Sequence, residues 1–359
     1  MERFDHVRAA EPDLRGFVRA LLDQTGATAA QVEAVARAVL DASARGVDTH
    51  GVRLVPAYVA SARDGRLNLR AEPRFERLAA SVGMVDGDNG FGHVASYLAI
   101  EEGAGLAREA GVAAVAVRNS SHHGATGCYT AEAARRGLIA LGMTHADAAV
   151  VPHGGVAPFF GTNPLSFAAP VPGDAPVVID MATSAVPLNR VFLWAENELP
   201  LHPNVGLDSS AEPARRPEDV KMLLPLGGLE FGYKGTALAM IVDLLCAGLT
   251  GMRIGAELEP LLGPDPKGPV PIAHVFILID SAAFGAAETF GRTVAHLLDR
   301  LRAVPGREGA PLAPGDPERR EAESRRVLGI PVDRHTWAAF EDFSRNFGLM
   351  LPPHGPARF

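Results

Sequence analysis

The sequence changes character near residue 75, and this change limits the folds open to the chain. Before it, the pattern is helical: apolar residues gather at 17–22, and Thr28 and Gln31 form a capping box ahead of a second helix that Gly46 ends. After it come short β-rich runs broken by glycine. These predicted strands lie at residues 111–117, 138–143, 177–180 and 270–280.

Helical patterns return within and after the β-rich part, at residues 129–136 and 286–302. With 359 residues, the chain is long enough for about two domains. We therefore predict an α+β fold in which both chain ends form an outer helical domain. The predicted parts are residues 1–75, the helical N-terminal part of the outer domain; 76–280, a central α+β domain; and 281–359, the C-terminal helical part.

Net charge and cysteine content indicate which partners and which cellular compartment to expect. The 34 Lys and Arg residues against 42 Asp and Glu give a net charge of −8, which argues against nucleic acid as a partner. The two distant cysteines and the charged N-terminus predict a cytoplasmic protein. The longest apolar run, residues 236–252, is short for a bilayer and carries Asp243, so we predict a buried helix and no membrane partner.

A glycine-rich segment at residues 90–95 imitates the fingerprint of a dinucleotide-binding Rossmann fold. A Rossmann turn needs a buried strand directly before its first glycine, whereas residues 86–89 read Asp-Gly-Asp-Asn. The next predicted strand also ends at Arg118 and Asn119, without the acid that binds ribose. We therefore predict a glycine-rich turn.

His50 is the first candidate for chemistry. It stands in Asp48-Thr49-His50-Gly51 directly after a predicted helix end, with an alcohol and a carboxylate beside it in sequence. Such neighbours can fix its tautomer and tune its pKa for proton transfer near neutrality. A loop histidine satisfied by the backbone is the alternative reading.

Residues 119–127 connect a predicted strand to a predicted helix and read Asn-Ser-Ser-His-His-Gly-Ala-Thr-Gly. Small residues there leave backbone N–H groups open to a ligand, and His122 and His123 add polar rings. A metal site with downstream His145, Asp147 and His153 is conceivable. However, no recognised ligand spacing is present, and we predict no metal.

Residues 227–235 form a second glycine-rich lead into a helix. Lys234 is one of only three lysines in the chain, and with the partial positive charge of a helix N-terminus it suits a phosphate or carboxylate. The alternative is an ordinary glycine-rich turn with a solvated lysine.

Six segments, taken in order, resemble the type 2 malate/L-lactate dehydrogenase family, which includes ureidoglycolate and sulfolactate dehydrogenases, diketogulonate reductase and piperideine-2-carboxylate reductases. They are residues 45–59 (RGVDTHGVRLVPAYV), 85–95, 119–129 (NSSHHGATGCY), 161–170, 179–186 (IDMATSAV) and 232–245 (GYKGTALAMIVDLL). They span nearly the whole chain.

The resemblance implies a homodimeric enzyme that uses NAD or NADP, with a β-rich, non-Rossmann nicotinamide-binding domain and an active site at a domain and subunit boundary. It implies that His50 is the proton donor, Thr49 its relay partner and Thr162 a substrate contact. His122 opens the stretch that lines cofactor and substrate. The implied cofactor contacts are His122, His123, Gly124, Ala125, Asp180, Met181, Ala182, Lys234 and Gly235.

Three departures from the family pattern bear on the substrate. Leu54 stands where the family usually has an arginine that grips the substrate carboxylate, and Arg53 lies one place earlier, so Arg53 is the candidate substrate contact. The usual Gly-Lys pair is Asn189-Arg190, which makes Arg190 a candidate cofactor contact. Residues 199–218 have lost most of the family pattern, and residues 201–219 read as an exposed loop.

We therefore expect an oxidoreductase that transfers a hydride between NAD(P)H and a small 2-oxo acid or cyclic 2-imino acid, with weak activity on simple acids such as pyruvate. An alternative is an epimerase or lyase that uses His50 and His122 as a two-base pair on a carbon acid, with a retained or vestigial nicotinamide site. A third is a non-catalytic relative that binds the cofactor.

Overall fold

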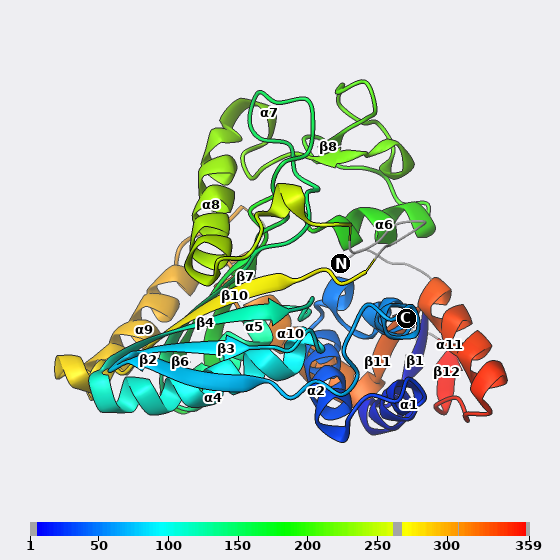
Figure 1. The fold of residues 1–359 in the computed structure, drawn as a ribbon. Coiled ribbons are helices and arrows are strands. Elements are labelled where there is room, and N and C mark those ends of the chain that lie inside the picture. The colour runs from blue at the N-terminus through cyan, green and yellow to red at the C-terminus, as the bar shows by residue number, and fades with distance from the viewer. Residues whose placement is uncertain (1–5, 261–267, 308, 357–359) are drawn as a thin grey trace.

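A computed structural model describes residues 6–260, 268–307 and 309–356, and its centre is one seven-stranded mixed sheet (Figure 1). In sheet order the strands are β2 (Arg74–Ala79), β3 (Val82–Asp86), β4 (Val112–Ser120), β10 (Ile272–Ile279), β5 (Ile139–Thr144), β6 (Leu165–Val171) and β7 (Asp174–Met181). Each predicted strand is confirmed, with ends that shift by a few residues. Among these neighbours only β3 and β4 run parallel.

The two faces of this sheet carry different helices because alternate side chains of a strand point to opposite sides. Val115 and Val117 of β4 pack with α4 (Gly92–Ala110) and α5 (Gly127–Arg135), whereas Ala116 packs with α8 (Tyr233–Asp243) and the π-helical turn after it. The sheet therefore lies between helical layers. The remaining helices here are α6 (Leu188–Glu196), α7 (Gly228–Phe231), α9 (Ala287–Arg302), which contacts β6, and α10 (Asp316–Leu328).

The two chain ends meet on one side of the molecule (Figure 1). Strand β1 (His6–Ala9) pairs with both β11 (Ile330–Asp333) and β12 (His354–Pro356) in a three-stranded sheet. Around it a second core forms from α1 (Glu11–Asp23), α2 (Ala29–Ala44), α3 (Val55–Arg63) and α11 (Arg334–Phe347).

Of the two hydrogen bonds of the predicted capping box at the start of α2, one is present. Thr28 Oγ1 accepts a hydrogen bond from Gln31 N at 3.4 Å, as a capping box requires. The Gln31 amide does not return to Thr28: its Oε1 accepts from Phe91 N at 2.9 Å. Gln31 therefore ties α2 to the turn that precedes α4. At the other end Gly46 has φ +82°, the left-handed conformation that ends a helix.

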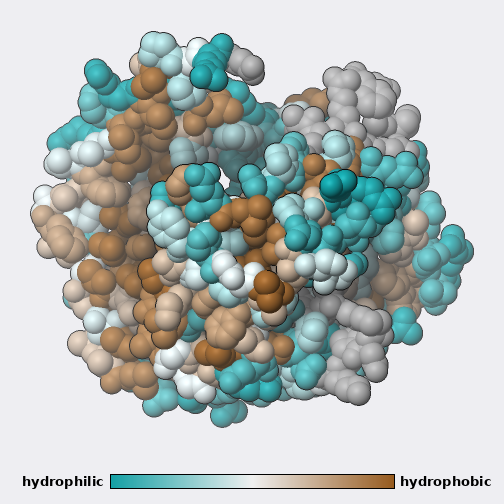
Figure 2. Space-filling view, turned by 90° about the horizontal axis from the view of Figure 1, so that it is seen from above, coloured by the Kyte–Doolittle hydropathy of each residue, from teal (hydrophilic) through white to brown (hydrophobic). Residues whose placement is uncertain are grey.

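The helix predicted at residues 236–252 is present as α8 and the π-helical turn after it, but it is only partly buried. One side of α8 is buried, but Met240 is 52% and Leu244 61% exposed, and Ile241 and Leu249 are exposed as well. Figure 2 shows hydrophobic residues gathered on the left of the face seen from above, the side on which α8 lies. A helix that is apolar all round is expected to be buried, but the sequence does not show which surface covers it. In this single chain the exposed apolar side chains of this helix face solvent.

The predicted exposed loop at residues 201–219 is only partly exposed. Val205 and Leu207 are buried, and β8 (Gly206–Leu207) pairs with β9 (Met222–Leu223). No described helix combines the length and apolar character needed to cross a membrane.

Candidate active site

A cavity of about 220 Å³ collects most of the residues that the sequence singled out. Its walls come from the turn after α2, the turn before α5, the end of β7, the start of α6 and α10. The lining residues are Gly46, Val47, Thr49, His50, Gly124, Ala125, Thr126, Thr162, Pro164, Asp180, Met181, Ala182, Pro187, Arg190 and Glu318. A larger hollow of about 470 Å³ lies over β2 and β3, but no predicted site residue lines it.

His50 is held in the cavity wall by its neighbours in the turn. It ends a short 3₁₀ turn (Asp48–His50), and Arg325 of α10 anchors that turn through paired contacts of 2.5 and 2.9 Å to the Asp48 carboxylate. A Cβ on Gly51 would lie 2.0 Å from Ser43 Oγ, so a larger residue there would displace the Ser43 hydroxyl that accepts from Val52 N. Thr49 Oγ1 lies 3.0 Å from His50 Nδ1.

His122 faces His50 with ring centroids 6.1 Å apart. Both rings line a small adjoining hollow of about 70 Å³ that Thr162 also borders. Burial, followed by the positive charge of Arg190, lowers the pKa of His50 to about 4. Burial, followed by the proximity of His50, lowers the pKa of His122 to about 3. Both imidazoles are therefore neutral near pH 7.

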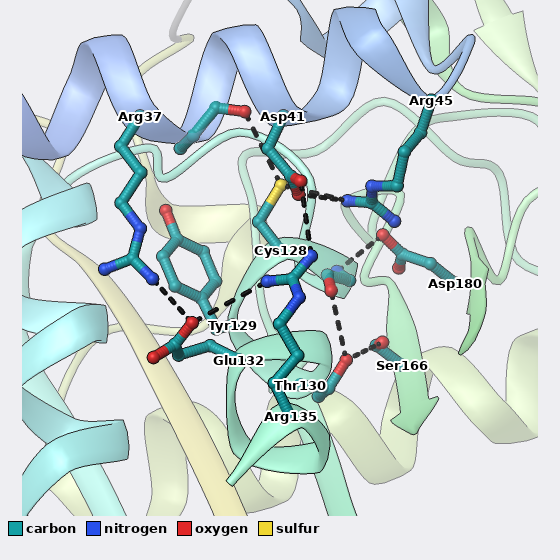
Figure 3. Close-up of polar contacts among 12 residues, drawn as sticks. Arg37, Asp41, Arg45, Cys128, Tyr129, Thr130, Glu132, Arg135, Ser166 and Asp180 are labelled. Atoms are coloured by element: carbon teal, nitrogen blue, oxygen red, sulfur yellow. Dashed lines mark hydrogen bonds and ion pairs between the residues drawn. The ribbon is translucent and has the colours of Figure 1, made fainter. Parts of the chain in front are cut away.

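Asp180, at the end of β7, caps the first turn of α5. Its Oδ2 accepts a hydrogen bond of 2.7 Å from Gly127 N, and beside it Arg45 donates to Asp41 and to Cys128 Sγ (Figure 3). Asp180 is exposed as a residue, but its carboxyl group lines the cavity, where desolvation raises its pKa to about 6. The Gly127 hydrogen bond and the charge of Arg45 oppose that rise.

Arg53 does not take the place of the missing arginine. Its Nη2 lies 2.5 Å from Glu196 Oε2 and its Nη1 lies 3.3 Å from Asp333 Oδ1, and it lines neither hollow. Leu54 is 5% exposed in the core of the chain ends. The prediction that Arg53 contacts the substrate therefore gains no support from the described lining residues. Among the described lining residues Arg190 supplies the only Lys or Arg side chain.

His123, expected beside the cofactor, lies in the core instead. It is buried, its Nδ1 lies 2.8 Å from Ser96 Oγ, and its Nε2 lies 3.1 Å from Thr126 Oγ1. Its ring stacks on His274 with centroids 4.0 Å apart. Consecutive residues of an extended turn point to opposite sides, so His122 and His123 cannot both face one cavity.

Lys234 and Gly235 also lie outside the lining. Lys234 is exposed, with its Nζ 5.6 Å from the ring centroid of Phe231. Gly235 is buried behind the wall, where a Cβ would lie 2.7 Å from Thr183 O, next to Ala182. Gly235 therefore supports the cavity, while Lys234 faces outward on the same side as the apolar surface of α8.

Glu318 and Tyr58 are polar residues at the site that the sequence did not single out. Glu318 comes from α10, far along the chain from the other lining residues, and no sequence pattern links it to them. Tyr58 of α3 donates or accepts a hydrogen bond of 2.8 Å at His122 Nδ1. Tyr58 lies eight positions after His50, in the segment 45–59 that carried the family resemblance. This position in a family motif was the one sequence signal that could have identified it.

The comparison with protein families agrees with the motifs. A family model described as malate/L-lactate dehydrogenase matches residues 10–341. The chain belongs to the malate/L-lactate dehydrogenase family. Within this family, a (2R)-3-sulfolactate dehydrogenase (NADP(+)) of Chromohalobacter salexigens is 35% identical over 79% of this chain and 83% of its own.

Other members of the malate/L-lactate dehydrogenase family cover more of the chain. A Δ1-pyrroline-2-carboxylate/Δ1-piperideine-2-carboxylate reductase of Pseudomonas putida is 33% identical over 91% of this chain and 94% of its own. The structure of a malate dehydrogenase from Pyrococcus horikoshii OT3 superposes with a TM-score of 0.88, 28% identity and coverage of 98% and 99%. The family assignment makes the chain a dehydrogenase or reductase that acts on small molecules.

Proposed function

We propose that the protein is an NAD(P)-dependent oxidoreductase that transfers a hydride to or from C2 of a small 2-oxo or 2-hydroxy acid, or of a cyclic 2-imino acid. One observation carries this proposal. His50, a proton donor candidate, and Arg190, a carboxylate-binding group, line the same cavity as the expected cofactor contacts Asp180, Met181 and Ala182. The named relatives reduce or oxidise substrates of these classes.

The cavity suits the nicotinamide and ribose half of the cofactor. The carboxylate of Asp180 can accept hydrogen bonds from ribose hydroxyls, and Glu318 Oε2 is buried without a hydrogen-bond partner among the described residues. Gly124 and Ala125 leave the backbone open to close approach. When bound, the nicotinamide supplies or accepts the hydride, and the protein contributes orientation and one proton.

His50 supplies the proton in the direction of reduction, and Thr49 orients its ring through Nδ1. In the free protein its pKa of about 4 keeps the ring neutral. The anionic groups of the cofactor and substrate raise the pKa of His50 when they bind nearby, because an opposite charge favours the protonated ring. Substrate binding and proton uptake are then coupled.

Arg190 contacts the substrate carboxylate in this proposal, in place of the arginine that Leu54 replaces. Its charge lowers the pKa of His50, so it lies within electrostatic reach of the proton donor. A guanidinium can grip a carboxylate through two parallel hydrogen bonds. Because the carboxylate-binding guanidinium would come from Arg190 and not from position 54, we expect weak activity on the smallest 2-oxo acids.

Assembly, location and domain organisation remain proposals. The exposed apolar side of α8 supports a homodimer, because solvent-facing patches of this kind mark protein interfaces. The single parallel pair β3 and β4 supports a non-Rossmann cofactor domain. We retain the three-part division at residues 75 and 280 and the cytoplasmic location as predictions.

The epimerase or lyase alternative keeps one supporting observation, the 6.1 Å approach of the His50 and His122 rings beside the cavity. Titration of the purified protein with NADH and NADPH, followed by fluorescence, tests the main proposal. Saturable binding of at least one cofactor, with its oxidation by pyruvate, oxaloacetate or a cyclic imino acid, is expected. Binding of neither would refute it.

A further inference from the structure

His122 differs from His50 in how its ring is held. Two groups meet the same nitrogen: Gly124 N lies 3.3 Å from His122 Nδ1, and Tyr58 Oη lies 2.8 Å from it. A backbone N–H can only donate, so Nδ1 must accept. A neutral imidazole has one donor and one acceptor nitrogen, and the proton of His122 is therefore on Nε2.

We propose that Tyr58 is a positioning residue which, with the Gly124 N–H, locks His122 in the Nε2–H tautomer, so that His122 acts as a hydrogen-bond donor to the substrate and not as a base. This inference rests on the proposed function for its substrate, but the tautomer itself does not.

The Tyr58 hydroxyl can fill this role because its ring is fixed. Tyr58 is 5% exposed, and the edges of two rings meet it: that of His93 at 5.0 Å between centroids and 89° between planes, and that of Phe91 at 6.0 Å and 87°. Burial raises the pKa of Tyr58 well above its usual value, so the hydroxyl stays protonated and can donate. His93, neutral because burial lowers its pKa to about 3, adds no charge beside it.

The other nitrogen of His122 makes no hydrogen bond to a described residue, and the ring lines the hollow shared with His50 and Thr162. A neutral Nε2–H aimed at a developing alkoxide stabilises negative charge without transferring its proton. To act as a base, His122 would have to accept at Nε2 and carry its proton on Nδ1. That proton would then face the Gly124 N–H, donor against donor.

The consequence separates two histidines that look alike in sequence. His50 meets the hydroxyl of Thr49, which can donate or accept, so His50 can change its protonation state during a reaction. His122 can do so only by losing the hydrogen bond from Gly124 N and reversing the one with the Tyr58 hydroxyl. A reaction that needs one proton and one hydrogen-bond donor is therefore favoured over a two-base reaction.

The test combines ¹⁵N NMR of histidine-labelled protein with kinetics, for wild type, Tyr58→Phe and the matched control Tyr97→Phe. Tyr97 lies in α4 against Arg37 and Tyr129 and is not among the residues that line the cavity or the adjoining hollow. The His122 signal, identified by its loss in His122→Gln, should show the Nε2–H tautomer in wild type and in Tyr97→Phe. In Tyr58→Phe it should move toward a tautomer mixture, with kcat about tenfold lower and the cofactor Kd unchanged.

A dominant Nδ1–H tautomer in wild type would overturn the assignment. A tautomer signal that Tyr58→Phe leaves unchanged would do so as well, even if kcat fell, because the role of Tyr58 would then be structural only. A protein with the expected tautomer behaviour that reduces no substrate with NADH or NADPH would keep this assignment and lose the oxidoreductase proposal.

Discussion

Two groups of histidines lie close together in this protein and differ in how well their nitrogens are satisfied. The core pair, His123 and His274, has a partner for every ring nitrogen: His123 meets Ser96 and Thr126, and His274 lies 2.7 Å from Thr144 Oγ1 and 3.0 Å from Ser120 Oγ. Complete satisfaction of buried polar groups is typical of structural residues.

The second group, called the cavity group here, comprises His50 and His122, which line the cavity or the adjoining hollow, and His93, buried against Tyr58. Its ring nitrogens have fewer hydrogen-bond partners than those of the core pair. His93 is fully buried and neither of its ring nitrogens has a hydrogen-bond partner among the described residues. The His50 ring has one such partner among them, the Thr49 hydroxyl. Buried polar groups without hydrogen-bond partners lower the free energy of unfolding, and purely structural residues rarely show them. The comparison teaches that neighbouring histidines are told apart by their hydrogen bonds and not by their motif.

The largest expected effect concerns the cavity group. His50→Ala should lower kcat by about a hundredfold to ten-thousandfold, the range for loss of a general acid, with little change in cofactor Kd. Steady-state kinetics and fluorescence titration measure the two quantities. His296→Ala, on the exposed side of α9, is the control. An equal loss of cofactor binding in His50→Ala would show that His50 is structural.

The core pair should respond in the opposite way. His123→Ala removes the partner of Ser96 and Thr126 and one ring of the stack, so the free energy of unfolding should fall by about 3 kcal/mol. The folded fraction should keep its kcat. Urea denaturation and assays below the transition check this. A lost kcat at unchanged stability would place His123 in the site after all.

Acid should destabilise the protein through the cavity group. His93 has a pKa of about 3 when folded and 6.5 as its ordinary value, so the unfolded chain binds more protons between these values. Its stabilising contribution is complete above pH 6.5 and falls as the pH drops, by about 2 kcal/mol at pH 5. His93→Leu should remove that share of the pH dependence in urea denaturation. Identical pH slopes in variant and wild type would contradict the buried neutral ring.

The smallest effect distinguishes two arginines. Arg190→Ala should raise KM for a 2-oxo acid by about tenfold or more, because a charge-assisted contact is lost, while cofactor binding changes less. Arg53→Ala should leave KM nearly unchanged, because its guanidinium is engaged by Glu196. The reverse pattern would restore the prediction made from sequence for Arg53.

Local features were the part of the fold that the sequence could predict. The cap at Thr28, the left-handed Gly46 and the apolar runs of β4 and β10 depend on neighbours in sequence, and the structure confirms them. The exposure of Leu244 depends on which distant elements pack against its helix, and apolar character alone cannot show it.

The candidate site shows the same division. The Asp48–Gly51 turn was predictable because its geometry is local. That Arg53 would face Glu196, or that Glu318 would join the cavity, depends on how distant elements pack. The motif containing His122 and His123 could not say which ring faces inward, since that follows from the partners Ser96 and Thr126.

The most direct test of the account follows the hydrogen that arrives at C2 of the substrate. The protein is incubated in D₂O with unlabelled NADH or NADPH and a 2-oxo or cyclic imino acid, and the product is analysed by NMR. We predict cofactor hydrogen at C2, no solvent deuterium there, and one cofactor oxidised per product formed. In a matched incubation that starts from the 2-hydroxy acid or saturated amino acid, solvent deuterium at C2 without cofactor turnover would contradict the account and favour the two-base alternative.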